Sequence, residues 1–462
     1  MEVTFTLADF RALAPLLILL SGGLSILLID CFKKSEELSF VLGLATFVFA
    51  FLFSLEIPAD VNALLSPWIR FDALGRFFSI FFIIVGIITL LLSYPLLNRF
   101  DAPSAEYYFL VISSVAGLIL IGQAADFLTL FIGLETLSLS LYILTGYMKK
   151  WNISHEAAMK YFLLGSLGAA FLIYGIAFIY GATGTTAIKH LAIANEFLFL
   201  LGLAFLTVGL CFKAAVVPFH TWAPDVYDGA PTAVTAFMSV GTKAGAFAGL
   251  VLVFLMGLAP IWHESIAWLA YPTLIYANYA ALTQTQLRRF FAYSGISHAG
   301  FLLIPLAAAT PESVNSLLFY LVVYGIATLG SFAILALLDN KEEGATLEDL
   351  KGLFYKSPFY ATVLTLCLLT LGGIPPTAGF FAKFYIFKVA YQTGYYGLII
   401  VGLLTSVLSA YYYLRIVAHL FAKPEEYDSL KSSWSLALVG VLSLAALISV
   451  TIFPDWWIQR IP

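Results

Sequence analysis

The chain has 462 residues, of which 61% are hydrophobic and only 11% are charged, and its mean hydropathy is +0.95. Soluble domains carry roughly 25% charged residues, so this composition excludes an ordinary soluble fold and indicates a polytopic protein of the lipid bilayer. The formal net charge of −4 gives no basic surface that could neutralise phosphates, which argues against a nucleic-acid partner.

The three cysteines, Cys31, Cys211 and Cys367, lie in or beside apolar runs and show no CxxC spacing. They therefore predict neither a disulfide framework nor an iron–sulfur or zinc site, and any redox chemistry is expected in another chain. The first residues lack the basic start and the cleavage site of a signal peptide, so the first apolar helix is expected to be retained.

Apolar runs long enough to cross a bilayer predict an all-α fold with about fourteen transmembrane helices. These runs are 12–30, 38–56, 72–94, 107–122, 126–147, 160–181, 196–229 (broken), 231–256, 266–284, 291–308, 313–338, 357–392 (broken), 396–420 and 434–453. Between them, the longest polar connection, 339–356, has mixed charge and is expected to be a solvated loop.

The runs group into two sets of five helices, and the fourth helix of each set is broken. Because five is an odd number, the second set is expected to be inverted relative to the first. This organisation predicts N-terminal helices in 1–106, a first repeat in 107–256, an inverted second repeat in 257–420 and a C-terminal helix in 421–462.

Basic residues predict the orientation of the chain in the membrane. With the N-terminus outside, fourteen loop lysines and arginines fall on the cytoplasmic side and five on the other. Cytoplasmic loops carry such an excess of lysine and arginine. We therefore expect an inner (plasma) membrane protein whose two termini both face the periplasmic side.

The run 196–229 carries the first break. As one straight helix it would be about 50 Å long at ~1.5 Å per residue, too long for a hydrocarbon core of ~30 Å. Pro218 removes a backbone donor, which frees carbonyls near Ala214 to bind water or a side chain, and Lys213 lies near mid-depth.

A second break has the same ingredients. In LTLGGIPPTAGFFAKFYIF, residues 369–387, two glycines and two prolines interrupt an apolar segment, and Lys383 follows within two turns. Paired interrupted helices in the two halves of a membrane chain indicate a transport pathway.

Charged side chains deep in the predicted spans are few. They are one carboxylate, Glu135, and three lysines, Lys213, Lys243 and Lys383. At ~2.5 to 3.5 kcal/mol for each central charge, the four would cost about 10 kcal/mol if unpaired and dry. One acid can hold one lysine charged but not three, so we expect Glu135 to pair with Lys213. The other two lysines are then candidates for proton transfer.

Two histidines extend this set. His298 is central in its run and flanked by serines, and His220 follows the Pro218 break, so either can pass protons near neutral pH. For both histidines, the alternative is a structural role in which the ring only forms hydrogen bonds to nearby backbone. For Glu135, the alternative is an ion pair that only fixes helix packing. Lys388 lies one turn nearer the surface and is expected to snorkel. The many phenylalanines and tyrosines are interpreted as lipid-facing or interfacial bulk.

The stretches FHTWAPDVYDGAPTAVTAF, FFAYSGISHAGFLL and GGIPPTAGFFAKF resemble a known family. They are similar to the antiporter-like membrane subunits of the proton-pumping NADH:quinone oxidoreductase, respiratory complex I, a family shared with multisubunit sodium/proton antiporters and membrane-bound hydrogenases. Within it, YFLLGSLGAAFLIYGIAFIYGATGT and Lys383 resemble the subunit N type.

The resemblance implies roles for the same residues. Glu135 matches the glutamate of the fifth helix, Lys213 its partner in the broken seventh, Lys243 the central lysine of the eighth and Lys383 the terminal lysine of the broken twelfth. His298 matches a polar position that continues the axis. The implied mechanism is that Glu135 and Lys213 separate or rejoin. This change drives a proton to the outside along a row of four side chains, which are those of Lys213, Lys243, His298 and Lys383.

The resemblance also implies where the energy comes from. FMN, iron–sulfur clusters, quinone and NADH are expected in partner subunits, with subunits M and K as neighbours, and no cofactor or metal in this chain. Three alternatives stay open: a homologous subunit of a cation/proton antiporter or membrane-bound hydrogenase, a stand-alone secondary transporter, and a purely structural scaffold, which the cost of the central charges disfavours.

Overall fold

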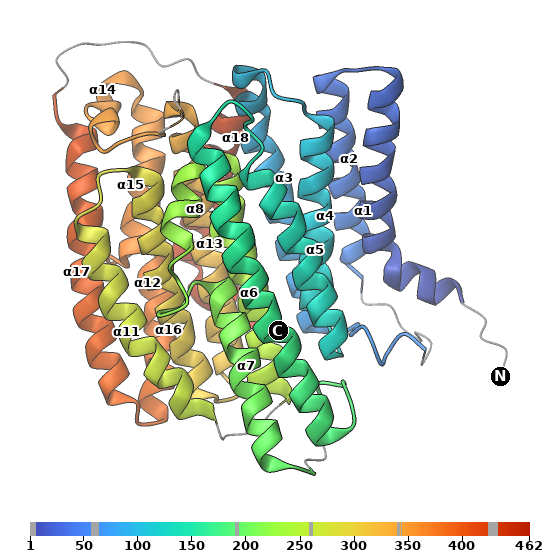
Figure 1. Cartoon of the computed structure of the whole chain (residues 1–462). Helices are drawn as coiled ribbons and strands as arrows, with labels where there is room; N and C mark the ends of the chain where they lie inside the picture. Colours follow the sequence, from blue (N-terminus) through green and yellow to red (C-terminus); the bar gives the residue numbers. More distant parts are fainter. Residues whose placement is uncertain are drawn as a thin grey trace.

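The molecule is a bundle of roughly parallel and antiparallel helices (Figure 1). A computed structural model describes residues 6–56, 64–189, 194–257, 262–339, 342, 344–423 and 433–462. Twelve helices in these ranges are long and apolar enough to cross a membrane, and the described residues form no strand. The predicted all-α polytopic class is confirmed.

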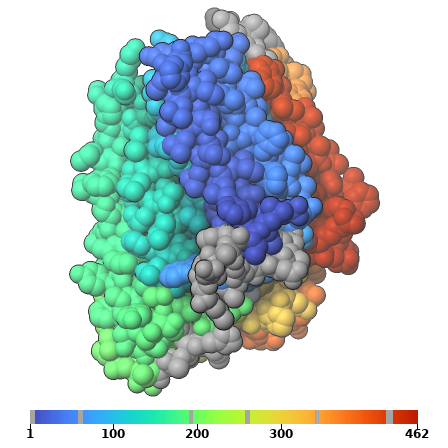
Figure 2. All heavy atoms as spheres, turned by 90° about the vertical axis from the view of Figure 1, so that its right-hand side faces the viewer, coloured from blue at the N-terminus to red at the C-terminus, as the bar shows by residue number. Residues whose placement is uncertain are grey.

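The N-terminal helices are α1 (Leu7–Phe32), α2 (Glu36–Ser54) and α3 (Ala73–Phe100). Each begins at a side-chain cap, in turn Thr6, Ser35 and Asp72, which satisfies backbone N–H groups of the first turn. Figure 2 shows these helices in blue, covering one face of the molecule between the green first half and the red C-terminal segment.

The next helices are α4 (Ala105–Gly122), α5 (Phe127–Thr145), α6 (Asn152–Thr183), α7 (Glu196–Ala214) and the short α8 (Ala223–Gly229). The predicted first break is confirmed, because α7 ends where Ala215 takes a left-handed conformation with φ 57°. Helix α6 packs closely on α7 through Gly175, where a Cβ would stand 2.5 Å from the backbone nitrogen of Leu206.

A buried helix at the centre of the bundle follows. It is built of α9 (Thr232–Phe237), a π-helical turn (Met238–Thr242), α10 (Lys243–Leu250) and a second π-helical segment (Val251–Gly257). Lys243 directly follows the first π-helical turn, and such turns are frequent at functional sites.

The second half repeats this plan. It contains α11 (His263–Leu282), α12 (Leu287–Ala308), α13 (Ser313–Leu338), a 3₁₀ turn (Glu348–Leu350), α14 (Leu353–Lys356), α15 (Pro358–Gly372), α16 (Ala378–Gln392), α17 (Tyr396–Phe421), α18 (Trp434–Ile452) and α19 (Pro454–Arg460). The second break is confirmed between α15 and α16, where Gly373 is left-handed with φ 73°. Every one of the fourteen predicted runs coincides with a helix or a broken pair.

The prediction that 339–356 is a solvated loop is wrong for part of its described residues, although Glu348 and Asp349 are exposed. Asp339 is 1% exposed, and Leu350 and Leu353 are fully buried. Asp339 is buried because it pairs with Arg288, and the two leucines add apolar area that removes the following turns from water. We call the end of the bundle that carries Arg288 and Asp339 the basic end.

Candidate functional site

Lys213 lies in the last turn of α7, at the first break. Its side chain is buried, and its Nζ has no hydrogen-bond partner among the residues that the structure describes. The ammonium instead lies over two tyrosine rings, 5.4 Å from the centroid of Tyr142 on α5 and 5.5 Å from that of Tyr161 on α6. Aromatic faces attract cations, so these rings replace part of the lost hydration.

Glu135 lies on α5 and is half-buried. Its Oε1 is buried and forms no hydrogen bond within the described part of the chain. The expected direct ion pair with Lys213 is not formed in this structure. Tyr142 lies two helical turns after Glu135 on the same face of α5, and its ring lies against the ammonium instead. The two charges are near enough to interact electrostatically without touching.

Lys243 reaches the broken end of α7. Its Nζ donates to the carbonyl of Ala214 at 3.2 Å, and Trp222 Nε1 donates to the carbonyl of Phe212 at 2.8 Å. The prediction that the break frees carbonyls near Ala214 for side chains is therefore confirmed. The C-terminus of a helix is the negative end of the helix dipole. The C-terminus of α7 is therefore a favourable place for a buried ammonium.

Lys383 repeats this arrangement at the second break. Its Nζ donates to the carbonyl of Gly372, the last residue of α15, at 2.9 Å, and to Ser409 Oγ at 3.5 Å. The ammonium also lies 4.7 Å from the ring centroid of Phe301. At both breaks, a buried lysine from a later helix thus binds the carbonyl end of the interrupted one.

His298 on α12 lies between the surroundings of Lys243 and those of Lys383. Its Nδ1 lies 2.7 Å from the hydroxyl of Tyr320 and its Nε2 lies 3.2 Å from that of Tyr413. His298 and Lys383 line one small cavity. One turn earlier on α12, Gly295 lies beside Lys243: a Cβ there would be 3.8 Å from Nζ.

His220 lies in the first break, outside this row. It is buried, and its Nδ1 has no hydrogen-bond partner in the described ranges of the chain. Its ring centroid lies 4.9 Å from that of Tyr276. Lys388 is exposed, as its expected snorkelling requires.

Buried tyrosines are the functional candidates that the sequence interpretation missed. Tyr142, Tyr320 and Tyr413 are not lipid-facing bulk, because each is buried against a lysine or a histidine of the row. A usable signal is the serine pattern of α12, since Ser294 contacts the hydroxyl of Tyr413. Among the residues that the structure describes, no three His, Cys, Asp or Glu side chains gather as metal ligands.

Comparisons with known proteins agree on the kind of protein. Residues 124–409 match the family described as NADH:quinone oxidoreductase/Mrp antiporter, TM. The chain is 53% identical to NADH-quinone oxidoreductase subunit N of Protochlamydia amoebophila, over 98% of both chains. It is also 36% identical to the subunit N of Trichlorobacter lovleyi, over 98% of this chain and 96% of that one.

A solved structure shares the fold. A chain of respiratory complex I from Thermus thermophilus with bound aureothin superposes with a TM-score of 0.84 and 32% identity, over 96% of this chain and 98% of that one. The chain belongs to the NADH:quinone oxidoreductase/Mrp antiporter transmembrane family and, within it, to the NADH-quinone oxidoreductase subunit N group.

Proposed function

We propose that this chain is a proton-translocating membrane-arm subunit of a NADH:quinone oxidoreductase. The observation that carries the proposal is the shared geometry of Lys243 and Lys383, each of which places a buried ammonium on the carbonyl end of an interrupted helix. A site of this kind holds a proton inside the membrane without a fixed carboxylate partner. The similarity to subunit N proteins supports the complex in which it works.

The proton moves along the row in single transfers. A change beside the subunit alters the distance between Glu135 and Lys213, and Lys213 then gives its proton toward Lys243, whose Nζ binds the neighbouring Ala214 carbonyl. Lys383 first releases its proton to the outside, which leaves it neutral, and it then accepts a proton through His298 from Lys243. Lys243 is neutral after this transfer and accepts the proton of Lys213, so that each donor is ready for the next proton. His220, in the first break, carries protons from the cytoplasmic side.

The energy for these steps is imported. Quinone reduction in other subunits drives the row, and FMN, iron–sulfur clusters, NADH and quinone are bound there. Subunits M and K are the neighbours, and the complex lies in the cell inner membrane with both termini of this chain on the periplasmic side. The excess of basic loop residues on one side supports that orientation.

A cation/proton antiporter subunit is the second candidate, because the matching family includes Mrp antiporters. Identity of 53% to a subunit N protein favours the oxidoreductase. Mass spectrometry of the complex purified through this chain separates the candidates. Flavin and iron–sulfur subunits are expected to co-purify, and a chain that transports while purified alone would be a stand-alone transporter instead.

The test of the relay is Lys213→Ala in the assembled complex, measured in inverted membrane vesicles. We expect proton pumping per NADH oxidised to fall sharply, while the amount of assembled complex stays near that of the wild type. Lys388→Ala is the matched control, because its lysine lies in the same membrane chain but is exposed. An unchanged ratio of protons to electrons in Lys213→Ala would refute the proposal.

A further inference from the structure

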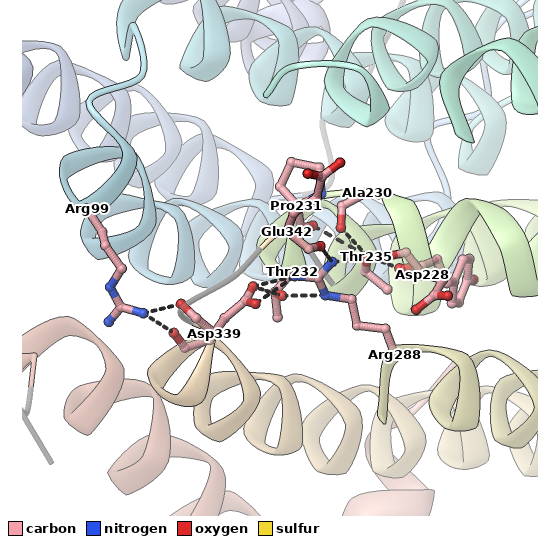
Figure 3. Close-up of polar contacts among 11 residues, drawn as sticks. Arg99, Asp228, Ala230, Pro231, Thr232, Thr235, Arg288, Asp339 and Glu342 are labelled. Carbon is pink, nitrogen blue, oxygen red and sulfur yellow. Dashed lines mark hydrogen bonds and ion pairs between the residues drawn. The ribbon is translucent and has the colours of Figure 1, made fainter. Parts of the chain in front are cut away.

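A buried polar network lies at the basic end of the bundle and includes Arg99, which donates to the carbonyl of Asp339 (Figure 3). Arg288 and Asp339 form an ion pair in which Nη2 donates to both carboxylate oxygens at 2.7 Å. Their side chains are 2% and 1% exposed. Arginine and aspartate side chains are rarely buried in proteins unless they are paired. The burial of Arg288 and Asp339 therefore depends on their ion pair.

The guanidinium also donates to the end of α8, to the start of α9 and, from Nη1 at 3.3 Å, to the carbonyl of Glu342. Nε donates to Thr232 Oγ1 at 3.0 Å, and Nη1 donates to the carbonyl of Asp228 at 2.9 Å. The hydroxyl of Thr232 in turn donates to Asp339. Arg288, Thr232 and Asp339 therefore form a closed triangle in which each pair is bonded.

Each corner of this triangle belongs to a helix of the proton row. Thr232 is the first residue of the helix that carries Lys243, and Arg288 is on α12, which carries His298. Asp339 directly follows α13, whose Tyr320 binds His298.

The two proton-carrying side chains lie at matching depths below the network. Lys243 is eleven residues after Thr232, and His298 is ten residues after Arg288, with both helices running away from the network. At ~1.5 Å per residue, these distances are about 16 Å and 15 Å. A rotation or slip of either helix at the triangle therefore changes the distance between Lys243 and His298.

Stability alone does not explain such a pair. Desolvation of two buried charges offsets most of their attraction, and well-packed apolar residues in their place often do as well or better. What the pair supplies is geometry, because the planar fork of a guanidinium fixes several partners in set directions, which an ammonium does not.

We propose that Arg288 is a positioning residue for proton transfer, which uses Asp339 and Thr232 to hold the Lys243 helix in register with the His298 helix. The proposal rests on the proposed function of the lysine row. Lys243 and His298 bind other partners in this structure, and proton transfer between them depends on how closely they can approach. A small change of register is therefore enough to slow it.

The experiment compares Arg288→Lys with Thr232→Val in the whole complex. Lysine keeps the charge beside Asp339 but cannot reach all four partner residues of Arg288 at once. Valine keeps the shape of threonine without its hydroxyl. Arg415→Lys is the matched control. Arg415 donates to the carbonyl of Leu282 at 3.1 Å and has no contact with the triangle.

Pumped protons per NADH are measured in inverted vesicles and expressed per assembled complex. Lys243→Met, which removes the proton-carrying group itself, gives the reference for lost pumping. The proton-to-NADH ratio of Arg288→Lys is expected to fall to that of Lys243→Met, and the ratio of Thr232→Val is expected to fall part of the way. Arg415→Lys is expected to keep the wild-type ratio. The solvent deuterium isotope effect on pumping is expected to rise in Thr232→Val, because proton transfer then limits the rate. A purely structural role would change only the amount of complex.

Each outcome bears on one proposal. A wild-type ratio in Arg288→Lys would overturn the positioning role, and if that variant assembles too poorly, a wild-type ratio and isotope effect in Thr232→Val would overturn it. Wild-type pumping by Lys243→Met would refute the proposed function itself and not only the positioning role.

Discussion

Replacing Lys243 by methionine tests the central step of the row. Methionine has a similar length and adapts to irregular space, so the packing beside Gly295 is kept. The change removes the hydrogen bond to the Ala214 carbonyl, and a hydrogen bond to a charged group contributes about 1.5–3 kcal/mol. A charge at the centre of the membrane costs ~2.5 to 3.5 kcal/mol, and the substitution removes this cost.

The two effects nearly cancel, which decides what Lys243→Met does. The free energy of folding should change by no more than about 2 kcal/mol, so the complex should still assemble. Pumping through this chain should stop, because the thioether holds no proton at neutral pH.

The assay is NADH-driven acidification of inverted vesicles, with assembled complex quantified on native gels. Lys388→Met is the control, since it removes an exposed lysine of the same chain. The reasoning fails if Lys243→Met assembles and pumps as many protons per NADH as the wild type does.

Two further variants test the surroundings of the row. Tyr413→Phe removes the hydroxyl that contacts His298 Nε2 and is expected to lower pumping per assembled complex, whereas Tyr412→Phe, which loses a bond to Asn278 instead, is expected to pump normally. Gly379→Ala would place a Cβ 1.7 Å from the carbonyl oxygen of Thr370. We expect a loss of about 3 kcal/mol or more and little assembled complex on native gels, while Gly181→Ala, with open space around it, should assemble like the wild type.

The breaks and the buried lysines could be predicted from sequence because their physics is local. An apolar run too long for the bilayer must be interrupted. Pro218 has no backbone N–H, so its place in the run predicts which carbonyls of the preceding turn lose their donors. A lysine amid apolar residues, such as Lys243, must then find an acceptor. The carbonyl of Ala214 supplies it. The sequence predicted that this carbonyl is freed, but not that Lys243 binds it.

The remaining contacts could not be predicted, because they join helices that are distant in sequence. Tyr413 reaches His298 from a helix more than a hundred residues later, and nothing in the local pattern distinguishes it from a lipid-facing tyrosine. Asp339 looked like a loop residue because its partner is on another helix. The position of the Lys213 ammonium over the ring of Tyr142, where a direct ion pair with Glu135 was expected, does not follow from residue spacing alone.

The lack of a direct ion pair between Glu135 and Lys213 suggests where the driving force acts. Lys243 and Lys383 hold their protons against backbone carbonyls that are fixed parts of two helix ends. Lys213 has no such acceptor, and its charge depends on two aromatic rings and on the nearby Glu135. A shift of α5 therefore changes the environment of Lys213 far more than that of the other two. Because an input must act on the adjustable site, we expect movement of α5 to start each transfer and the fixed sites to receive it.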